Sequence, residues 1–98
     1  MNKKKTQEKE DFQNYLSDQL KNPMIKKYYD ESGKQLEVAY RILKLRKQKG
    51  MSQVELAKKI GTKQSNVARI EAGQQNFSVD TLEKIAKAFG CDLKIDFV

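Results

Sequence analysis

The chain has 98 residues, of which 38% are hydrophobic, and its 20 Lys and Arg outnumber 13 Asp and Glu to give a formal net charge of +7. This length fits one compact domain with at most a short arm, and the positive charge favours a polyanionic partner, most commonly nucleic acid. One cysteine excludes an internal disulfide, the absence of histidine argues against a metal site, and no apolar run is long enough to span a membrane.

The first residues do not have the pattern of a secretory signal. A basic start, Met1 to Lys5, is followed by polar residues and not by an apolar core. Together with the lone cysteine, Cys91, this predicts a protein of the cytoplasm, where thiols stay reduced.

An N-terminal arm, residues 1–36, precedes the main domain. Its Lys-rich start, residues 1–10, is expected to be a flexible tail. In residues 11–20 the apolar residues recur at helical spacing, which predicts one helix with an apolar stripe. The residues of this stripe are Phe12, Tyr15, Leu16 and Leu20.

Two further helix starts follow. Asn22 and Pro23 are typical of an N-cap and a first helical position, and they predict a short helical piece. Ser32 and Gln35 fit a capping box, which predicts the start of a longer helix that ends near Lys49.

The segment from Ser52 to Gly73 predicts two short helices joined by a turn that contains a glycine. Ser52 and Glu55 fit a second capping box, and the helix that they open is expected to end near Ile60. Thr62 is expected to cap the next helix. Two short helices in this arrangement indicate a helix-turn-helix.

The exposed face of the second of these helices has the composition of a base-reading surface. Its polar residues are Lys63, Gln64, Ser65, Asn66 and Arg69. No acidic residue lies between Thr62 and Ile70. Gln and Asn pair with adenine, Arg pairs with guanine, and a helix N-terminus offers N–H groups to phosphate. The pattern therefore predicts contact with DNA.

The C-terminal end changes from helical to strand spacing. Ser78 is expected to cap a last helix, after which apolar and charged residues alternate from Asp92 to Val98. The apolar residues are Leu93, Ile95 and Phe97. Because a single strand leaves its backbone groups unpaired, residues 91–98 are predicted to pair with the same strand of a second copy, in a homodimer. A frayed tail is the alternative.

The positions that carry a family resemblance are Ile42, Leu45, Arg46, Gly50, Met51, Ser52, Gln53, Glu55, Leu56, Ala57, Gly61, Ser65, Val67, Ile70, Glu71 and Gly73. With this spacing, residues 37–90 resemble the lambda-repressor/Cro-like (XRE) helix-turn-helix family. The resemblance implies that the second helix of the motif lies in the major groove of DNA.

Residue roles follow from the resemblance by position. It implies that Gln64, Ser65 and Arg69 read bases and that Gln53 anchors a phosphate. Lys63 and Asn66 are implied as further DNA contacts. It also implies a structural ion pair between Arg46 and Glu71, which would fix the pose of the recognition helix.

The N-terminal arm is similar to the extension that precedes the DNA-binding domain in HigA-type antitoxins of type II toxin–antitoxin systems. This resemblance implies a repressor that neutralises a small basic RelE-like ribonuclease toxin and regulates their shared operon. The residues that would bind the toxin are Phe12, Tyr15, Leu16, Leu20, Met24 and Tyr28. Alternatively, these side chains only cover the outside of the helical bundle.

The sequence therefore predicts an all-α fold: a five-helix bundle containing a helix-turn-helix, with a short C-terminal β-strand that pairs across a homodimer. The predicted function is repression of transcription at a palindromic operator in double-stranded DNA, with no cofactor and no membrane contact. Two alternatives remain: a stand-alone repressor of phage or mobile-element type, and a protein-interaction module that kept the fold without binding DNA. No convincing nucleophile and base occur together, which argues against an enzyme.

Overall fold

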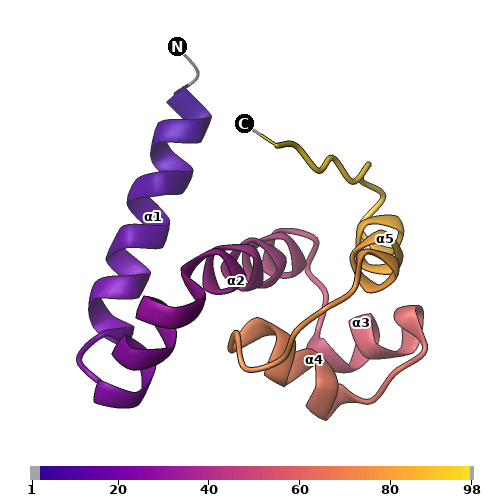
Figure 1. Ribbon diagram of the computed structural model, residues 1–98. Helices are drawn as coiled ribbons and strands as arrows, with labels where there is room; N and C mark the ends of the chain where they lie inside the picture. Colours follow the sequence, from indigo (N-terminus) through magenta and orange to yellow (C-terminus); the bar gives the residue numbers. More distant parts are fainter. Residues whose placement is uncertain (1–2, 98) are drawn as a thin grey trace. The chain divides into compact units, whose positions relative to one another are not determined.

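The computed structural model describes the backbone of residues 3–97 and the side chains of that range, apart from those of residues 3–9, 25 and 28–32. The helices are α1 (Lys3–Gln19), α2 (Pro23–Gln48), α3 (Gln53–Ile60), α4 (Gln64–Glu71) and α5 (Val79–Ala88) (Figure 1). Residues 3–97 contain no strand, so the all-α class and the five helices are confirmed. None of the helices in this range is long and apolar enough to cross a membrane.

The chain separates into two compact units, residues 1–37 and residues 38–98, and α2 contributes to both. In the first unit α1 begins at Lys3, inside the segment that was expected to be a flexible tail. Phe12 and Leu16 on α1 and Leu36 on α2 are buried. These burials agree with the apolar stripe that the spacing predicts.

The start of α2 agrees with the sequence prediction, but its interior does not. Asn22 caps the helix because its Oδ1 accepts a hydrogen bond from the N–H of Met24 at 3.0 Å. The predicted new start at Ser32 and Gln35 is wrong, since α2 runs unbroken from Pro23 to Gln48. The helix can continue through this region because no proline follows Pro23 and because Gly33, inside the helix, costs only about 1 kcal/mol relative to alanine.

The second unit is built around one cluster of buried apolar side chains. The cluster consists of Ile42, Leu56, Ala57, Val67, Ile70, Ile85 and Phe89, contributed by α2, α3, α4 and by α5 with its C-cap. Burial of this set stabilises the unit, because each fully buried aliphatic side chain contributes about 1.5–3 kcal/mol. The core lies behind α3 and α4 and holds both helices in place.

Local signals set the ends of the short helices. The Ser52 capping box is present, with the N–H of Glu55 donating to Ser52 Oγ at 3.0 Å and the N–H of Ser52 donating to Glu55 Oε1 at 3.3 Å. α3 ends at Gly61, whose φ of 74° is left-handed backbone that favours glycine. Ser78 caps α5 by accepting from the N–H of Thr81 at 3.1 Å, as predicted.

Two sequence expectations, the N-cap of α4 and the C-terminal strand, are wrong. The N-cap of α4 is Lys63 and not Thr62, and Thr62 Oγ1 instead accepts a hydrogen bond from Asn66 Nδ2 at 2.7 Å. Residues 91–97 form no strand. A strand needs a second strand to satisfy its backbone, and the described part of this single chain provides none. The predicted pairing across a homodimer is therefore not supported by the fold of one chain.

Candidate nucleic-acid interface

α3 and α4 pack against each other around the turn at Gly61 and leave the N-terminal end of α4 at the surface. Val67 and Ile70 on α4 are buried in the core, together with Leu56 and Ala57 on α3. The polar residues predicted to contact DNA lie on the other side. Lys63, Gln64, Ser65 and Arg69 are exposed, and Gln53 and Asn66 are partly exposed. Burial of one side of α4 therefore presents the opposite side to solvent.

A buried ion pair lies behind this surface. Arg46, on α2, donates from Nε to Glu71 Oε2 at 2.6 Å and from Nη2 to Glu71 Oε1 at 2.9 Å. Arg46 Nη1 also donates to the carbonyl of Met51 at 2.8 Å. The hydrogen bonds to Glu71 raise the pKa of Arg46, burial opposes this, and the opposite charge of Glu71 adds to the rise. The guanidinium therefore stays charged and ties α2 to the end of α4.

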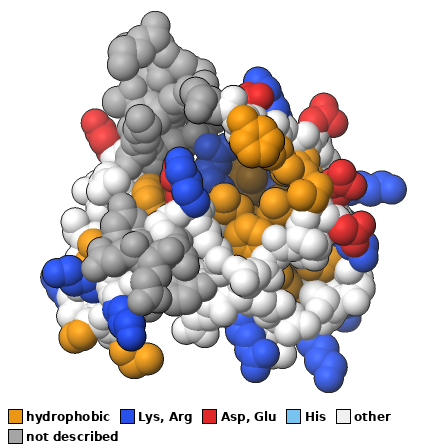
Figure 2. Space-filling view, in the orientation of Figure 1, with side chains coloured by type: hydrophobic (Ala, Val, Ile, Leu, Met, Phe, Trp, Pro, Cys, Tyr) orange, Lys and Arg blue, Asp and Glu red, His pale blue; other side chains and the backbone are white. Residues whose placement is uncertain are grey.

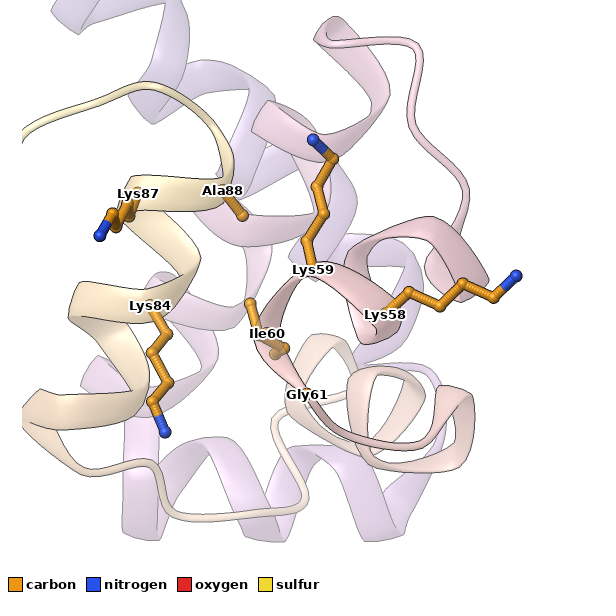
Figure 3. Close-up of a pocket in the computed structure, with 7 residues that line it drawn as sticks. All are labelled: Lys58, Lys59, Ile60, Gly61, Lys84, Lys87 and Ala88. Carbon is orange, nitrogen blue, oxygen red and sulfur yellow. The ribbon is translucent and has the colours of Figure 1, made fainter.

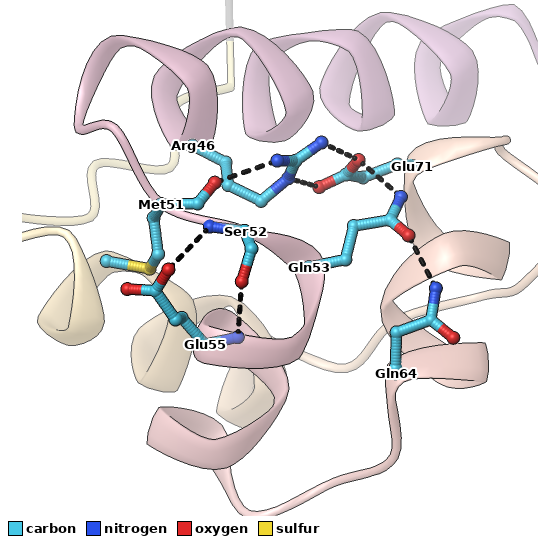
Figure 4. A network of polar contacts seen from close by, with 7 residues as sticks. All are labelled: Arg46, Met51, Ser52, Gln53, Glu55, Gln64 and Glu71. Carbon is cyan, nitrogen blue, oxygen red and sulfur yellow. Dashed lines mark hydrogen bonds and ion pairs between the residues drawn. The ribbon is translucent and has the colours of Figure 1, made fainter.

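The first residues of α3 and α4 extend this pair to the surface (Figure 4). Gln53 Nε2 donates to Glu71 Oε1 at 3.1 Å, and Gln64 Nε2 donates to Gln53 Oε1 at 2.7 Å. A chain of hydrogen bonds therefore runs from Arg46 through Glu71 and Gln53 to Gln64. We call these four residues the polar network.

The polar network orients the amide of Gln64 without using all of its hydrogen-bonding groups. An amide has two N–H donors and a carbonyl acceptor, and the bond to Gln53 uses one donor. One N–H and the carbonyl oxygen of Gln64 are outside this bond, and they are the donor and acceptor that an adenine edge requires. The link between Gln53 and Gln64 was not predicted, although both residues are the first of their helices.

The charge on this side of the molecule suits a polyanion. The only acidic residues of the segment 52–72 are Glu55 and Glu71. Glu55 closes the capping box at the start of α3, and Glu71 pairs with Arg46. Both carboxylates are thus engaged within the protein, whereas the cations Lys63 and Arg69 are exposed. The surface around the N-terminal end of α4 is consequently polar and basic.

The residues suggested for toxin binding do not form one exposed stripe. Phe12 and Leu16 are buried, while Tyr15 and Leu20 are partly exposed. Met24 stands out with 80% of its surface exposed. Tyr28 lies outside the residues whose side chains the structure describes. Among the members of this set that the structure describes, Met24 is therefore the side chain best exposed to meet a partner.

Comparison with known proteins gives one family model, whose match lies within the second unit, and two curated relatives. A family model described as "Helix-turn-helix" matches residues 42–95. The "Competence pilus inhibition repressor" of Acinetobacter baylyi is 41% identical over 54 residues, which are 55% of this chain and 49% of that protein. An "Uncharacterized HTH-type transcriptional regulator" of Archaeoglobus fulgidus is 36% identical over 58 residues, which are 59% of this chain and 83% of that protein.

The chain thus spans about half the length of the Acinetobacter protein and most of the Archaeoglobus one. No solved structure matches the chain.

Proposed function

The chain belongs to the helix-turn-helix family, and we propose that it is a sequence-specific DNA-binding repressor of transcription. The observation that carries this proposal is the polar network, which holds Gln64 at the exposed N-terminal end of α4. In the proposed complex α4 lies in the major groove, and Gln64, Ser65 and Arg69 meet base edges. Gln53, Lys63 and Asn66 make the phosphate and further contacts.

The affinity of the full chain for DNA tests this proposal. A binding site is first selected from a pool of random duplexes, and binding is then measured by fluorescence anisotropy at several salt concentrations. Gln64→Ala/Arg69→Ala is expected to weaken binding about 30-fold or more, because each base contact contributes roughly 1–3 kcal/mol. Binding should also fall steeply with salt.

A matched control separates this loss from a change in charge. Gln13→Ala/Lys27→Ala removes the same residue type and one positive charge at exposed positions of the first unit. It should leave the affinity within a factor of about two, since surface substitutions have small effects. Failure of the selection to enrich any duplex would contradict the proposal and favour a protein-interaction module on the same fold.

We further propose that the repressor acts as a homodimer on a palindromic operator. Leu93, Ile95 and Phe97 are respectively 37%, 53% and 101% exposed, so the apolar side of the C-terminal segment is uncovered in one chain. Figure 2 shows hydrophobic side chains gathered beside this segment on the face turned to the viewer. Pairing with a second copy would cover them, and a palindromic operator would require the two recognition helices of such a dimer to lie about 34 Å apart.

The finer proposal is an antitoxin role. Residues 1–37 form a compact unit that lies outside the matched range 42–95, so DNA binding alone does not account for it. We propose that this unit binds a small basic RelE-like ribonuclease, with Met24 as an exposed apolar anchor. A repressor without a toxin partner is the second candidate, and it fits the name of the Acinetobacter relative.

Co-purification from the native cell distinguishes these two candidates. If the antitoxin proposal is correct, a small basic protein remains bound to the full chain. The ribonuclease activity of that small protein is then inhibited by the full chain. Met24→Asp should release it, because a charge would enter an apolar contact. Gln13→Asp, at an exposed polar position of the same unit, should not. Recovery of DNA alone would favour the stand-alone repressor.

A further inference from the structure

A second surface of the helix-turn-helix unit has a different character. A hollow of about 500 Å³ lies between the last turn of α3 and the C-terminal half of α5 (Figure 3). Its lining residues are Lys58, Lys59, Ile60, Gly61, Lys84, Lys87 and Ala88. We call it the α3–α5 hollow. Nothing in the proposed reading of DNA by α4 uses it.

The α3–α5 hollow combines an apolar floor with a basic rim. Figure 3 shows Ile60 on α3 and Ala88 on α5 between the two helices. Gly61 adds no side chain, and a Cβ at this position would meet nothing within 4 Å. The rim consists of four lysines, and none of the described residues that line the hollow is acidic.

Helix stability explains only part of this arrangement. Lys58 and Lys59 lie in the last turn of α3, and Lys87 lies in the last turn of α5, where positive charge stabilises the helix dipole. Lys84 lies earlier in α5 and pairs with Asp80 at 3.2 Å. That pair is exposed and contributes little, so it does not hold Lys84 away from a partner. Dipole stabilisation also gives no reason for two helices to place their lysines around one apolar floor.

The directions of the lysines select the kind of partner. In Figure 3 the ammonium groups of Lys58, Lys59, Lys84 and Lys87 point in different directions and do not converge on one point. A small anion would therefore meet at most part of the rim. In this view Lys58 and Lys87 extend outward on opposite sides, so an extended chain with several carboxylates meets all four lysines only when these flexible side chains turn toward it. An apolar floor also has no counterpart in a phosphate backbone, but an aliphatic side chain of a peptide would cover it.

We propose that the α3–α5 hollow is a docking site for an acidic peptide segment of another protein. Its carboxylates meet the four lysines, and one apolar side chain packs over Ile60 and Ala88. The hollow begins at the last turn of α3, whereas Gln53 of the polar network is the first residue of that helix. The two ends of α3 are about 10 Å apart along the axis. At its other side the hollow adjoins the proposed DNA-binding surface, because Gly61 lies two residues before Lys63.

The probe for this site is a short fluorescein-labelled peptide in which glutamates flank a single leucine, and anisotropy measures its binding to the full chain. Lys84→Gln/Lys87→Gln is expected to weaken binding by about 2-fold to 25-fold, because each lost exposed charge pair reduces affinity by roughly 1.4-fold to 5-fold. Lys58→Gln/Lys59→Gln, in α3, should weaken peptide binding by a similar factor. Lys26→Gln/Lys27→Gln, which removes equal charge from the exposed start of α2, should change affinity by less than about twofold.

A twin peptide with serine in place of leucine tests the apolar floor, and it should bind more weakly than the leucine peptide. Equal affinity of the two peptides, or equal loss with the control variant, would overturn the proposal. DNA is the rival ligand. If Lys84→Gln/Lys87→Gln weakened binding to the selected duplex more than the control variant did, and left peptide binding unchanged, the hollow would be a phosphate contact. Base reading by α4 would stand in either case.

Discussion

The two units of the chain are stabilised in different ways. In residues 38–98 an apolar core is joined by a buried ion pair, and in the described part of the chain no buried side-chain nitrogen or oxygen lacks a hydrogen-bond partner. Among the side chains of residues 1–37 that the structure describes, the buried ones are apolar, such as Phe12 and Leu16. Polar networks demand particular residues at particular places, whereas an apolar stripe only demands spacing. In the second unit, residues 38–98, roles can therefore be assigned to individual residues, whereas in the first unit, residues 1–37, the sequence indicates only an apolar surface.

The largest effect is expected from breaking the ion pair. Arg46→Ala should lower the free energy of unfolding by about 3–5 kcal/mol, because Glu71 would keep its buried charge without a partner. Urea unfolding followed by circular dichroism measures this. Lys47→Ala, at the exposed neighbouring position on α2, should change it by less than about 0.5 kcal/mol. Equal unfolding curves for Arg46→Ala and the parent would contradict the claim that a buried ion pair stabilises residues 38–98.

A cavity in the first unit should have a smaller and more local effect. Leu16→Ala removes a side chain that is only 3% exposed, and it should cost about 2–3 kcal/mol. Because residues 1–37 form their own unit, hydrogen exchange should quicken there while protection in α3, α4 and α5 stays the same. Loss of protection in both units would mean that they unfold as one. Ser17→Ala, next to it and exposed, serves as the control.

The capping box at the start of α3 should contribute less again. Ser52→Ala removes the acceptor for the N–H of Glu55, and it should lower the free energy of unfolding by about 1 kcal/mol. Thermal melting measures the change against Ser17→Ala. A melt of Ser52→Ala that coincides with the parent would show that the core alone fixes the start of α3.

Some of this structure could be predicted because local chemistry decides it. Ser52 with Glu55, and Ser78 before α5, set helix starts through bonds to their own neighbours. The same signal failed at Ser32, where continuing the helix satisfies the backbone without a cap. Thr62 is not the cap because α4 begins one residue later than predicted, with Lys63 as its N-cap, and the Thr62 hydroxyl bonds to the side chain of Asn66. Capping residues thus mark helix starts only where another feature also stops the preceding helix.

Other features depend on partners that no local pattern contains. The predicted strand at residues 91–98 needs a second strand to satisfy its backbone groups. Alternating apolar residues alone therefore do not determine whether this segment forms a strand. The bond between Gln53 and Gln64 joins residues far apart in sequence, and only the packing of α3 on α4 brings them together. The exposed face of α4 was predictable from composition, but the way in which Gln64 is oriented was not.

The most direct test of the account is a double-mutant cycle on Gln53 and Gln64, measured as affinity for the selected operator duplex. If the polar network orients Gln64 for base reading, Gln53→Ala and Gln64→Ala should not add, and the coupling should be about 0.5–2 kcal/mol. The Gln13→Ala variant, paired with Gln64→Ala, should add within about 0.5 kcal/mol. Equal additivity in both cycles would contradict the central claim, because Gln64 would then act without support from Gln53.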